Sequence, residues 1–316
     1  MSTQHPTLVR RIHIDTDPGL DDLLALALAL ASPEVRVEGI TTVAGNASLE
    51  HVTRNARGFL TLAGVEIPVG RGAAAPLELP AVHAEHVHGS DGRMGIALPT
   101  TDSGPSLRAR SVLRRSLQER RVEQLVALGP LTNVAELLSE EPALFDDVEI
   151  VWMGGTLADG NVTPLAEFNA HADPTAAARV LQSGLQVRVI GLEVTTLVRL
   201  RACDLPDAPF GTSPIARFLE QVLRGLMQTE QPLYGEPCAL LHDPCAVVAA
   251  IFPNCFRYES KRLAVCVEDG RERGRMLEKN EASGVAAEYA VEVRGPEVIR
   301  LFLDRLAAWS GKLDPH

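Results

Sequence analysis

Residues 12–22 of the chain read Ile-His-Ile-Asp-Thr-Asp-Pro-Gly-Leu-Asp-Asp. Apolar and polar residues alternate over the first positions, which predicts a short β-strand, and Pro18 with Gly19 predicts a tight turn directly after it. A helix is then predicted from Leu20 to about Ala31, because this stretch is mostly apolar and Ser-Pro follows it. Its uninterrupted apolar run has nine residues, whereas a membrane span needs roughly 20. We therefore expect a buried helix.

Strand and helix patterns continue to alternate along the chain. Strands are predicted at residues 35–43, 67–69, 124–128, 148–153 and 186–192, and helices at 49–63, 107–119, 174–183 and 214–229, after 131–133 and from about 243. Residues 71–106 lack periodicity and predict a long loop, whereas 261–268 and 287–293 predict a peripheral strand pair before a last helix at 296–309. This order predicts an α/β fold: a single large domain over residues 1–316, with a mostly parallel central sheet and helices on both faces.

The composition excludes several classes of protein. Of the 316 residues, 46% are apolar, which is enough for a sizeable core and excludes a disordered chain. The chain has 30 Lys and Arg against 41 Asp and Glu, a formal net charge of −11, so neither nucleic acid nor an anionic membrane is expected as a partner. Five cysteines without a Cys-x-x-Cys pair, and an N-terminus without an apolar signal sequence, favour a cytoplasmic protein.

Four aspartates lie within the eight residues 15–22, directly after the first predicted strand. In open parallel sheets, ligands bind at the carboxyl ends of the strands. Capping of the following helix explains one or two of these aspartates, but four repel one another, and a hard divalent cation with oxygen ligands would relieve that repulsion. The pattern therefore favours a metal site over a solvated turn.

Two further polar groups are weaker signals. His242 and Asp243 open a predicted helix and could supply a titratable side chain beside a metal ligand. Glu167 and Asn169, preceded by Asn161, follow a predicted strand and could bind hydroxyl groups. A helix cap and an ordinary hydrogen-bonded loop explain these two groups equally well.

Six segments, in this order along the chain, resemble the inosine-uridine preferring nucleoside hydrolases. They are DTDPGLDD (15–22), TTVAGN (41–46), GPLTN (129–133), MGG (153–155), AEFN (166–169) and HDPCAV (242–247). The resemblance covers most of the chain and implies the Rossmann-like fold of these hydrolases. It also implies their reaction, the hydrolysis of the N-glycosidic bond of ribonucleosides to ribose and free base with one bound calcium ion (Ca2+), for nucleoside salvage or catabolism.

Carried onto the matching positions, the resemblance implies residue roles. Asp17, Asp22, Asp243 and the backbone carbonyl of Leu128 would hold calcium, and Asp17 would take a proton from a calcium-bound water. The ribose pocket would be formed by Asp21, Asn46, Met153, Asn161, Glu167 and Asn169. The leaving base needs a proton or a hydrogen bond, for which His242, beside a calcium ligand, is the first candidate, His88 the second and Tyr234 the third.

The choice of substrate stays open at this point. His242 before Asp243 fits the non-specific or pyrimidine-favouring branch of the family, because purine-specific members tend to carry Trp at the matching position. Arg93 and Met94 depart from the usual loop sequence after His88, and they leave the preferred base undetermined. The resemblance suggests a homodimer or homotetramer, although no stretch identifies the interface.

Two other functions remain possible from the sequence. One is a metal-dependent phosphohydrolase of the Asp-x-Asp type, in which an aspartate after the first strand acts as a nucleophile. The other is a non-catalytic protein that binds nucleosides. Ribose release from nucleosides would exclude both alternatives.

Overall fold

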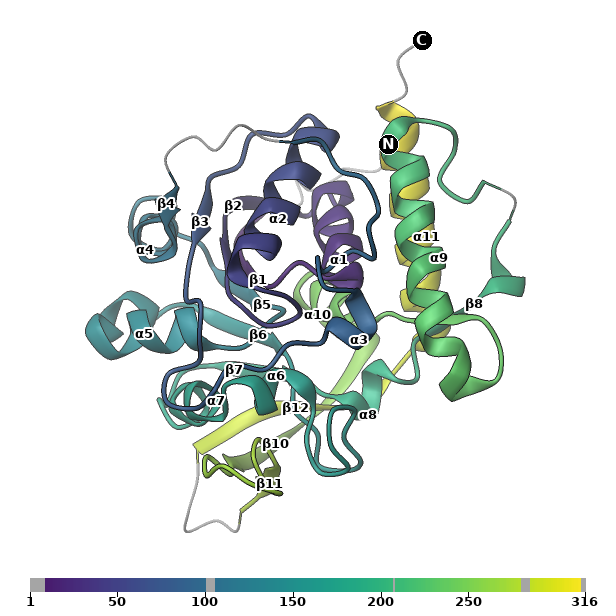
Figure 1. Ribbon diagram of the computed structural model, residues 1–316. Coiled ribbons are helices and arrows are strands. Elements are labelled where there is room, and N and C mark those ends of the chain that lie inside the picture. Colours follow the sequence, from purple (N-terminus) through teal and green to yellow (C-terminus); the bar gives the residue numbers. More distant parts are fainter. Residues whose placement is uncertain (1–8, 101–105, 207, 280–284, 314–316) are drawn as a thin grey trace, which may run out of the picture.

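Strand β1 (Arg10–Thr16) pairs in parallel with β2 (Val35–Thr42) on one side and with β5 (Gln124–Ala127) on the other. The computed structural model describes residues 9–100, 106–206, 208–279 and 285–313, and the main sheet within them has the order β11-β10-β12-β7-β6-β5-β1-β2-β3-β4 (Figure 1). Its other strands are β3 (Val69–Arg71), β4 (Leu107–Arg108), β6 (Glu149–Met153), β7 (Val187–Ile190), β10 (Phe256–Val265), β11 (Met276–Glu278) and β12 (Val285–Val293). The pairings from β4 across to β12 are parallel, whereas β10 is antiparallel to both of its neighbours. The predicted mostly parallel sheet is confirmed.

Helices cover both faces of this sheet, as predicted. One face carries α1 (Leu20–Ala31), α2 (Leu49–Ala63), α9 (Pro214–Tyr234), α10 (His242–Ile251) and α11 (Gly295–Lys312), and the other carries α4 (Ala109–Gln118), α5 (Thr132–Glu140) and α7 (Pro174–Leu181). Alternate residues of β6 serve the two cores: Val151 and Met153 pack in the first, Ile150 and Trp152 in the second. Because side chains alternate across a strand, a strand covered on both faces is apolar at nearly every position.

Helix α1 is buried along most of its length, from Leu20 to Ala29. It packs against α9, α10 and α11, so most of its nine-residue apolar run is covered by protein. Its observed bounds match the predicted ones. Within the residues that the structure describes, no helix is long and apolar enough to cross a membrane.

The structure differs from the sequence prediction in two long elements and in several short ones. Strand β10 begins at Phe256 instead of residue 261, and α9 continues to Tyr234 instead of ending at residue 229. Strand β3 begins at Val69 instead of residue 67, and the predicted long loop contains the short helix α3 (Glu85–His88). The predicted peripheral strands pair with each other, but β12 also joins β7 and makes the pair part of the main sheet. The prediction missed α6 (Phe168–Ala172), α8 (Leu192–Thr195) and the small sheet of β8 (Arg199–Arg201) and β9 (Cys238–Leu240). Elements of three to five residues are too short to show a period.

Candidate active site

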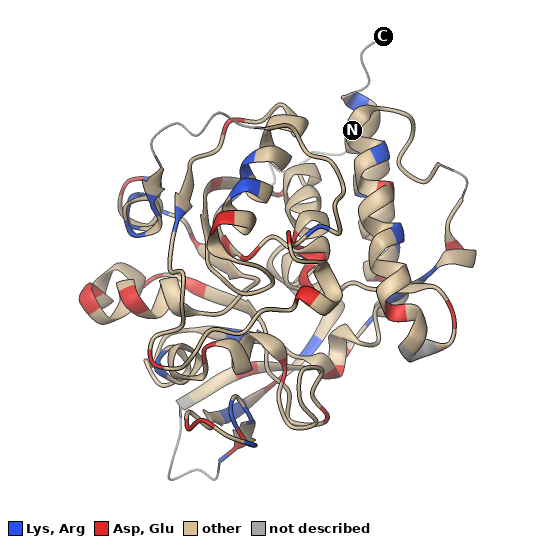
Figure 2. Cartoon of the chain, in the orientation of Figure 1, with Lys and Arg blue, Asp and Glu red and all other residues tan. Residues whose placement is uncertain are grey.

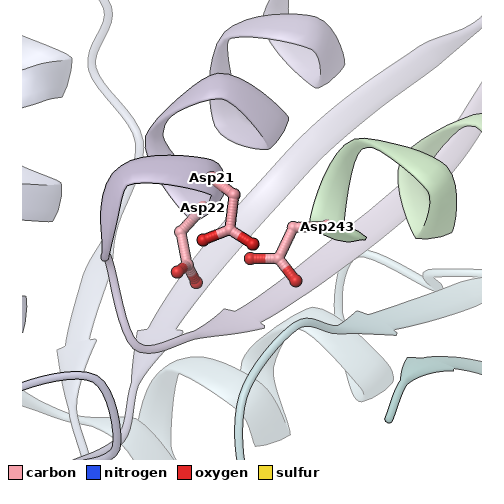
Figure 3. A group of neighbouring side chains, drawn as sticks. All are labelled: Asp21, Asp22 and Asp243. Atoms are coloured by element: carbon pink, nitrogen blue, oxygen red, sulfur yellow. The ribbon is translucent and has the colours of Figure 1, made fainter. Parts of the chain in front are cut away.

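Three carboxylates from two helices meet at the carboxyl edge of the sheet. Asp21 and Asp22 lie in the first turn of α1, and Asp243 lies in the first turn of α10, which packs against α1. One oxygen from each carboxylate lies within 4.8 Å of the others (Figure 3). All three side chains are buried. Figure 2 shows that Asp and Glu are otherwise spread over most elements, so this cluster is a local feature and not a consequence of the net charge.

Asp22 holds the turn between β1 and α1. Its Oδ1 accepts hydrogen bonds from the Thr16 hydroxyl and from the backbone N–H of Asp17, the latter at 3.2 Å. Its Oδ2 accepts from the Gly19 N–H and from the Asn46 side-chain amide, both at 2.9 Å. Asp22 therefore caps α1, which is the role that helix capping predicted for one or two of these aspartates. The four donors also fix the position of its carboxylate.

Asp17 lies deeper, outside the group of three, and is completely buried. Its Oδ2 accepts the backbone N–H of Asn46 at 2.7 Å, whereas its Oδ1 has no hydrogen-bond partner among the described residues. One oxygen each of Asp15 and Asp21 is buried and unpartnered in the same way. Burial, and then repulsion from Asp22, raises the pKa of Asp17 well above its ordinary value. Unpaired, buried carboxylate oxygens are what a hard cation would complement.

Burial raises the pKa of each of these carboxylates. Burial, followed by repulsion from Asp21, raises the pKa of Asp22 and holds the pKa of Asp243 well above its ordinary value. Burial also raises the pKa of Asp21 to about 6 and that of Asp15 to about 7. All the atoms that could bind a metal here are oxygens. When ionised, these carboxylates carry more negative charge than neighbouring protein groups neutralise. The residues present thus fit a divalent cation such as calcium.

A cavity of about 900 Å3 opens above the carboxylates. Ten of the sequence-predicted site residues line it: Asp21, Asn46, His88, Leu128, Met153, Asn161, Glu167, Asn169, His242 and Asp243. Asp17 and Asp22 lie behind this lining and are fully buried. Tyr234 ends α9, but its side chain lies outside the residues that the structure describes.

The predicted ribose-binding loop is held by its own hydrogen bonds. The Glu167 carboxylate accepts the backbone N–H groups of Asn169 at 2.8 Å, Ala170 at 3.0 Å and Gly155 at 2.7 Å, so it caps α6. The Asn169 amide donates to the carbonyls of Leu128 at 2.7 Å and Met153 at 3.0 Å, which joins the ends of β5 and β6. These polar side chains therefore have a structural role in addition to lining the cavity.

Two histidines face the cavity in neutral form. The Leu20 backbone N–H donates to His88 Nδ1 at 3.1 Å, so that nitrogen is an acceptor. The Nδ1 atom of His242 lies 2.8 Å from the hydroxyl of Thr195. Burial lowers the pKa of His88 and of His242 to about 4. At neutral pH either ring can donate a hydrogen bond from a neutral N–H.

The cavity also contains an acid that sequence reasoning did not identify. Glu230, on α9, lines the cavity and is 8% exposed. Burial, followed by repulsion from Asp21, raises the pKa of Glu230 to about 7. The helix was predicted to end at residue 229, and a single acidic residue near the end of an amphipathic helix carries no signal of its own.

The sequence matches a known family of enzymes. The sequence profile of the inosine-uridine preferring nucleoside hydrolases matches residues 12–300. The chain belongs to this family. The pyrimidine-specific ribonucleoside hydrolase RihA of Salmonella typhimurium is 41% identical over 250 residues, which cover 78% of this chain and 80% of that protein.

Solved nucleoside hydrolases have the same fold. The plant nucleoside hydrolase PpNRh1 superposes with a TM-score of 0.88 at 32% identity, and a purine-preferring ribonucleoside hydrolase from Gardnerella vaginalis with 0.86 at 27% identity. In each case the match covers 95% of this chain and 99% of the other. This nucleoside hydrolase family member is therefore an enzyme that hydrolyses ribonucleosides, as its sequence resemblance implied. The similarities do not support the phosphohydrolase and binding-protein alternatives.

Proposed function

We propose that this nucleoside hydrolase uses calcium to cleave ribonucleosides, pyrimidine nucleosides alone or together with purine nucleosides, to ribose and free base. The observation that carries the proposal is the buried group of Asp21, Asp22 and Asp243 beneath the 900 Å3 cavity. It combines an all-oxygen donor set with a chamber that is lined by polar side chains and two histidines.

The proposed calcium ligands are Asp17, Asp22, Asp243 and the carbonyl of Leu128. A bound calcium ion would supply a water of lowered pKa and coordination positions for ribose hydroxyls. Asp17 would act as the base, because its buried Oδ1 lacks a hydrogen-bond partner among the described residues and can take a proton. Positive charge nearby would favour the ionised form of Asp17 that this role requires.

The remaining carboxylates suit the bond that breaks. Loss of the base leaves an oxocarbenium-like cation on the ribose, and fixed negative groups around it stabilise the developing charge. Asp21 and Glu167 line the cavity where this charge would form. With Asn46, Asn161, Asn169 and Met153 they would also hold and orient the sugar.

The leaving base would receive a hydrogen bond from His242. Since its pKa is lowered to about 4, the ring would donate from a neutral N–H and not as an imidazolium. His88 is the second candidate for this contact and Tyr234 the third. The name of the 41%-identical RihA, together with His242 at this position, supports activity on pyrimidine nucleosides.

A panel of uridine, cytidine, inosine and adenosine tests the proposal, with ribose release measured in calcium and after chelation. We expect release from uridine or cytidine in calcium and its loss on chelation. Release from none of the four would contradict the hydrolase assignment, and full activity in chelator would contradict the calcium dependence. We further propose a cytoplasmic homodimer or homotetramer acting in nucleoside salvage or catabolism; light scattering of the purified protein measures its assembly.

A further inference from the structure

A buried hydroxyl lies behind the histidine that faces the cavity. Thr195 is the last residue of α8 and is completely buried. Its Oγ1 lies 2.8 Å from Nδ1 of His242, which is within hydrogen-bonding distance. His242 also lines the cavity, and Nδ1 is the ring nitrogen for which a hydrogen bond is found among the described residues. Nε2 is thus left for a bound molecule.

Which of the two groups donates this hydrogen bond can be inferred from the acceptor that the Thr195 hydroxyl proton needs. A helical threonine commonly donates to the backbone carbonyl four residues earlier, and the neighbouring Thr196 does so, to Leu192 at 2.7 Å. Thr195 does not: in the described part of the chain, His242 Nδ1 is the acceptor found for its hydroxyl. If Nδ1 carried the proton, Thr195 would accept it and its own buried proton would lack a partner, which is unfavourable. The Thr195 hydroxyl therefore donates, and Nδ1 accepts.

We propose that Thr195 is a positioning residue that holds neutral His242 with its proton on Nε2, directed toward the leaving base. A neutral imidazole carries one proton, so an accepting Nδ1 requires a donating Nε2. The hydrogen bond also fixes the rotation of the ring. This inference rests on the proposed role of His242 as the group that contacts the base.

Helix α8 is itself held firmly, which a positioning role requires. The Oε1 atom of Glu193, two residues before Thr195, accepts the Thr156 hydroxyl at 3.0 Å and the N–H groups of Leu157 at 2.6 Å and Ala158 at 3.0 Å. Its Oε2 accepts the hydroxyl of Tyr289 on β12. The same short helix thus anchors the loop after β6 and the orientation of His242.

Thr195→Val and Thr195→Ser form a matched pair for the test. Valine keeps the branched shape and removes the hydroxyl, whereas serine keeps the hydroxyl. We expect Thr195→Val to lower kcat for uridine about tenfold or more, since a misplaced proton donor loses part of the roughly 10²-fold or larger gain from acid catalysis. Thr195→Ser should stay close to the unaltered enzyme. Both should hydrolyse p-nitrophenyl riboside at nearly unchanged rates, because that leaving group needs no proton.

A selective loss on uridine with rescue by serine supports the inference, and equal slowing of both substrates, or no slowing, overturns it. The 15N shifts of His242 in the unaltered protein give a second measurement that does not depend on how the valine variant folds. A protonated Nε2 with a bare Nδ1 is expected, and a protonated Nδ1 overturns the inference. His242→Ala is assayed in parallel. If it slows both substrates equally, the proposed role of His242 fails, whereas the NMR result still decides the orientation by Thr195.

Discussion

Gly45 lies directly against the carboxylate of Asp17: a Cβ atom at position 45 would stand 2.0 Å from Asp17 Oδ2. The same oxygen accepts the N–H of Asn46, so the loop cannot withdraw without breaking that bond. We expect Gly45→Ala to displace Asp17 and to lower kcat/KM at least about 100-fold, since a shift of about 1 Å in a catalytic group has an effect of that size. Steady-state kinetics on the preferred nucleoside measure the loss.

Gly311→Ala is the matched control for this substitution. Gly311 lies in α11, and an added Cβ would meet no atom of the described residues within 4 Å. Alanine favours a helix over glycine by up to about 1 kcal/mol, so the control should keep full activity and melt at the same or a slightly higher temperature. Ordinary kinetics in Gly45→Ala would show that Asp17 tolerates displacement and would contradict the proposed role of its position.

Asp17→Asn tests the base without changing the shape of the side chain. Its amide oxygen can still accept the Asn46 N–H, but it cannot take a proton from water. We expect kcat to fall by about 10²-fold to 10⁴-fold, as for the loss of a general base. In chelator the melting temperature should be unchanged or higher, because repulsion between buried carboxylates is relieved. Circular dichroism confirms the fold. Wild-type turnover in this variant would exclude Asp17 as the base.

The fold was largely predictable because the apolar pattern indicates most of its long elements. Helix α1 and helix α2 have their predicted bounds, and the end of α1 was marked in addition by Ser32 and Pro33. The position of β12 was not predictable. Its parallel pairing with β7 depends on how segments far apart in the sequence pack together. The alternation of apolar and polar residues within one strand does not indicate its neighbour.

The candidate site also has residues that the sequence predicts and residues that it does not. The aspartates after β1 could be recognised because four lie together in sequence, and the parallel sheet predicts which edge they share. Thr195 and Glu230 could not be recognised. Their importance comes from contacts with His242 and with the cavity, and those contacts exist only after α8 and α9 have packed.

Stability should also depend on His13, which lies on β1 and is completely buried. Its nitrogens lie 2.9 Å from the hydroxyls of Ser116 and Thr41, and burial lowers the pKa of His13 to about 3. Between pH 6.5 and about pH 3 the unfolded chain binds a proton at this position that the folded chain does not. The contribution of His13 to stability therefore falls as the pH is lowered through this window, by up to about 1.4 kcal/mol per pH unit.

Chemical denaturation of His13→Gln at several pH values checks this prediction. Glutamine offers an amide to both hydroxyls and does not titrate. As the pH is lowered from 6 to 4, the stability of the unaltered protein relative to the variant should fall by about 1 kcal/mol per pH unit. The other buried histidines, His88 and His242, keep part of the slope in both proteins. Parallel curves would show that His13 is protonated in the folded state.

Calcium and pH should act together on stability, because the buried carboxylates have raised pKa values without a compensating cation. At these carboxylates the folded chain then binds more protons than the unfolded chain between the ordinary carboxyl pKa and about pH 7, the value for Asp15. Stability present at low pH is thus lost as the pH rises through this window. A bound cation favours the ionised carboxylates and removes this loss.

We therefore expect calcium to stabilise the protein more at pH 8 than at pH 5, reaching about 2.7 kcal/mol where free calcium exceeds its Kd 100-fold. Thermal melts in calcium and in chelator, at four pH values across this range, give the difference directly. Asp243→Asn removes one proposed ligand and one buried charge, so it should reduce both the calcium effect and the loss of stability with pH in chelator. A calcium effect that is the same at every pH would mean that the cation does not interact with these carboxylates.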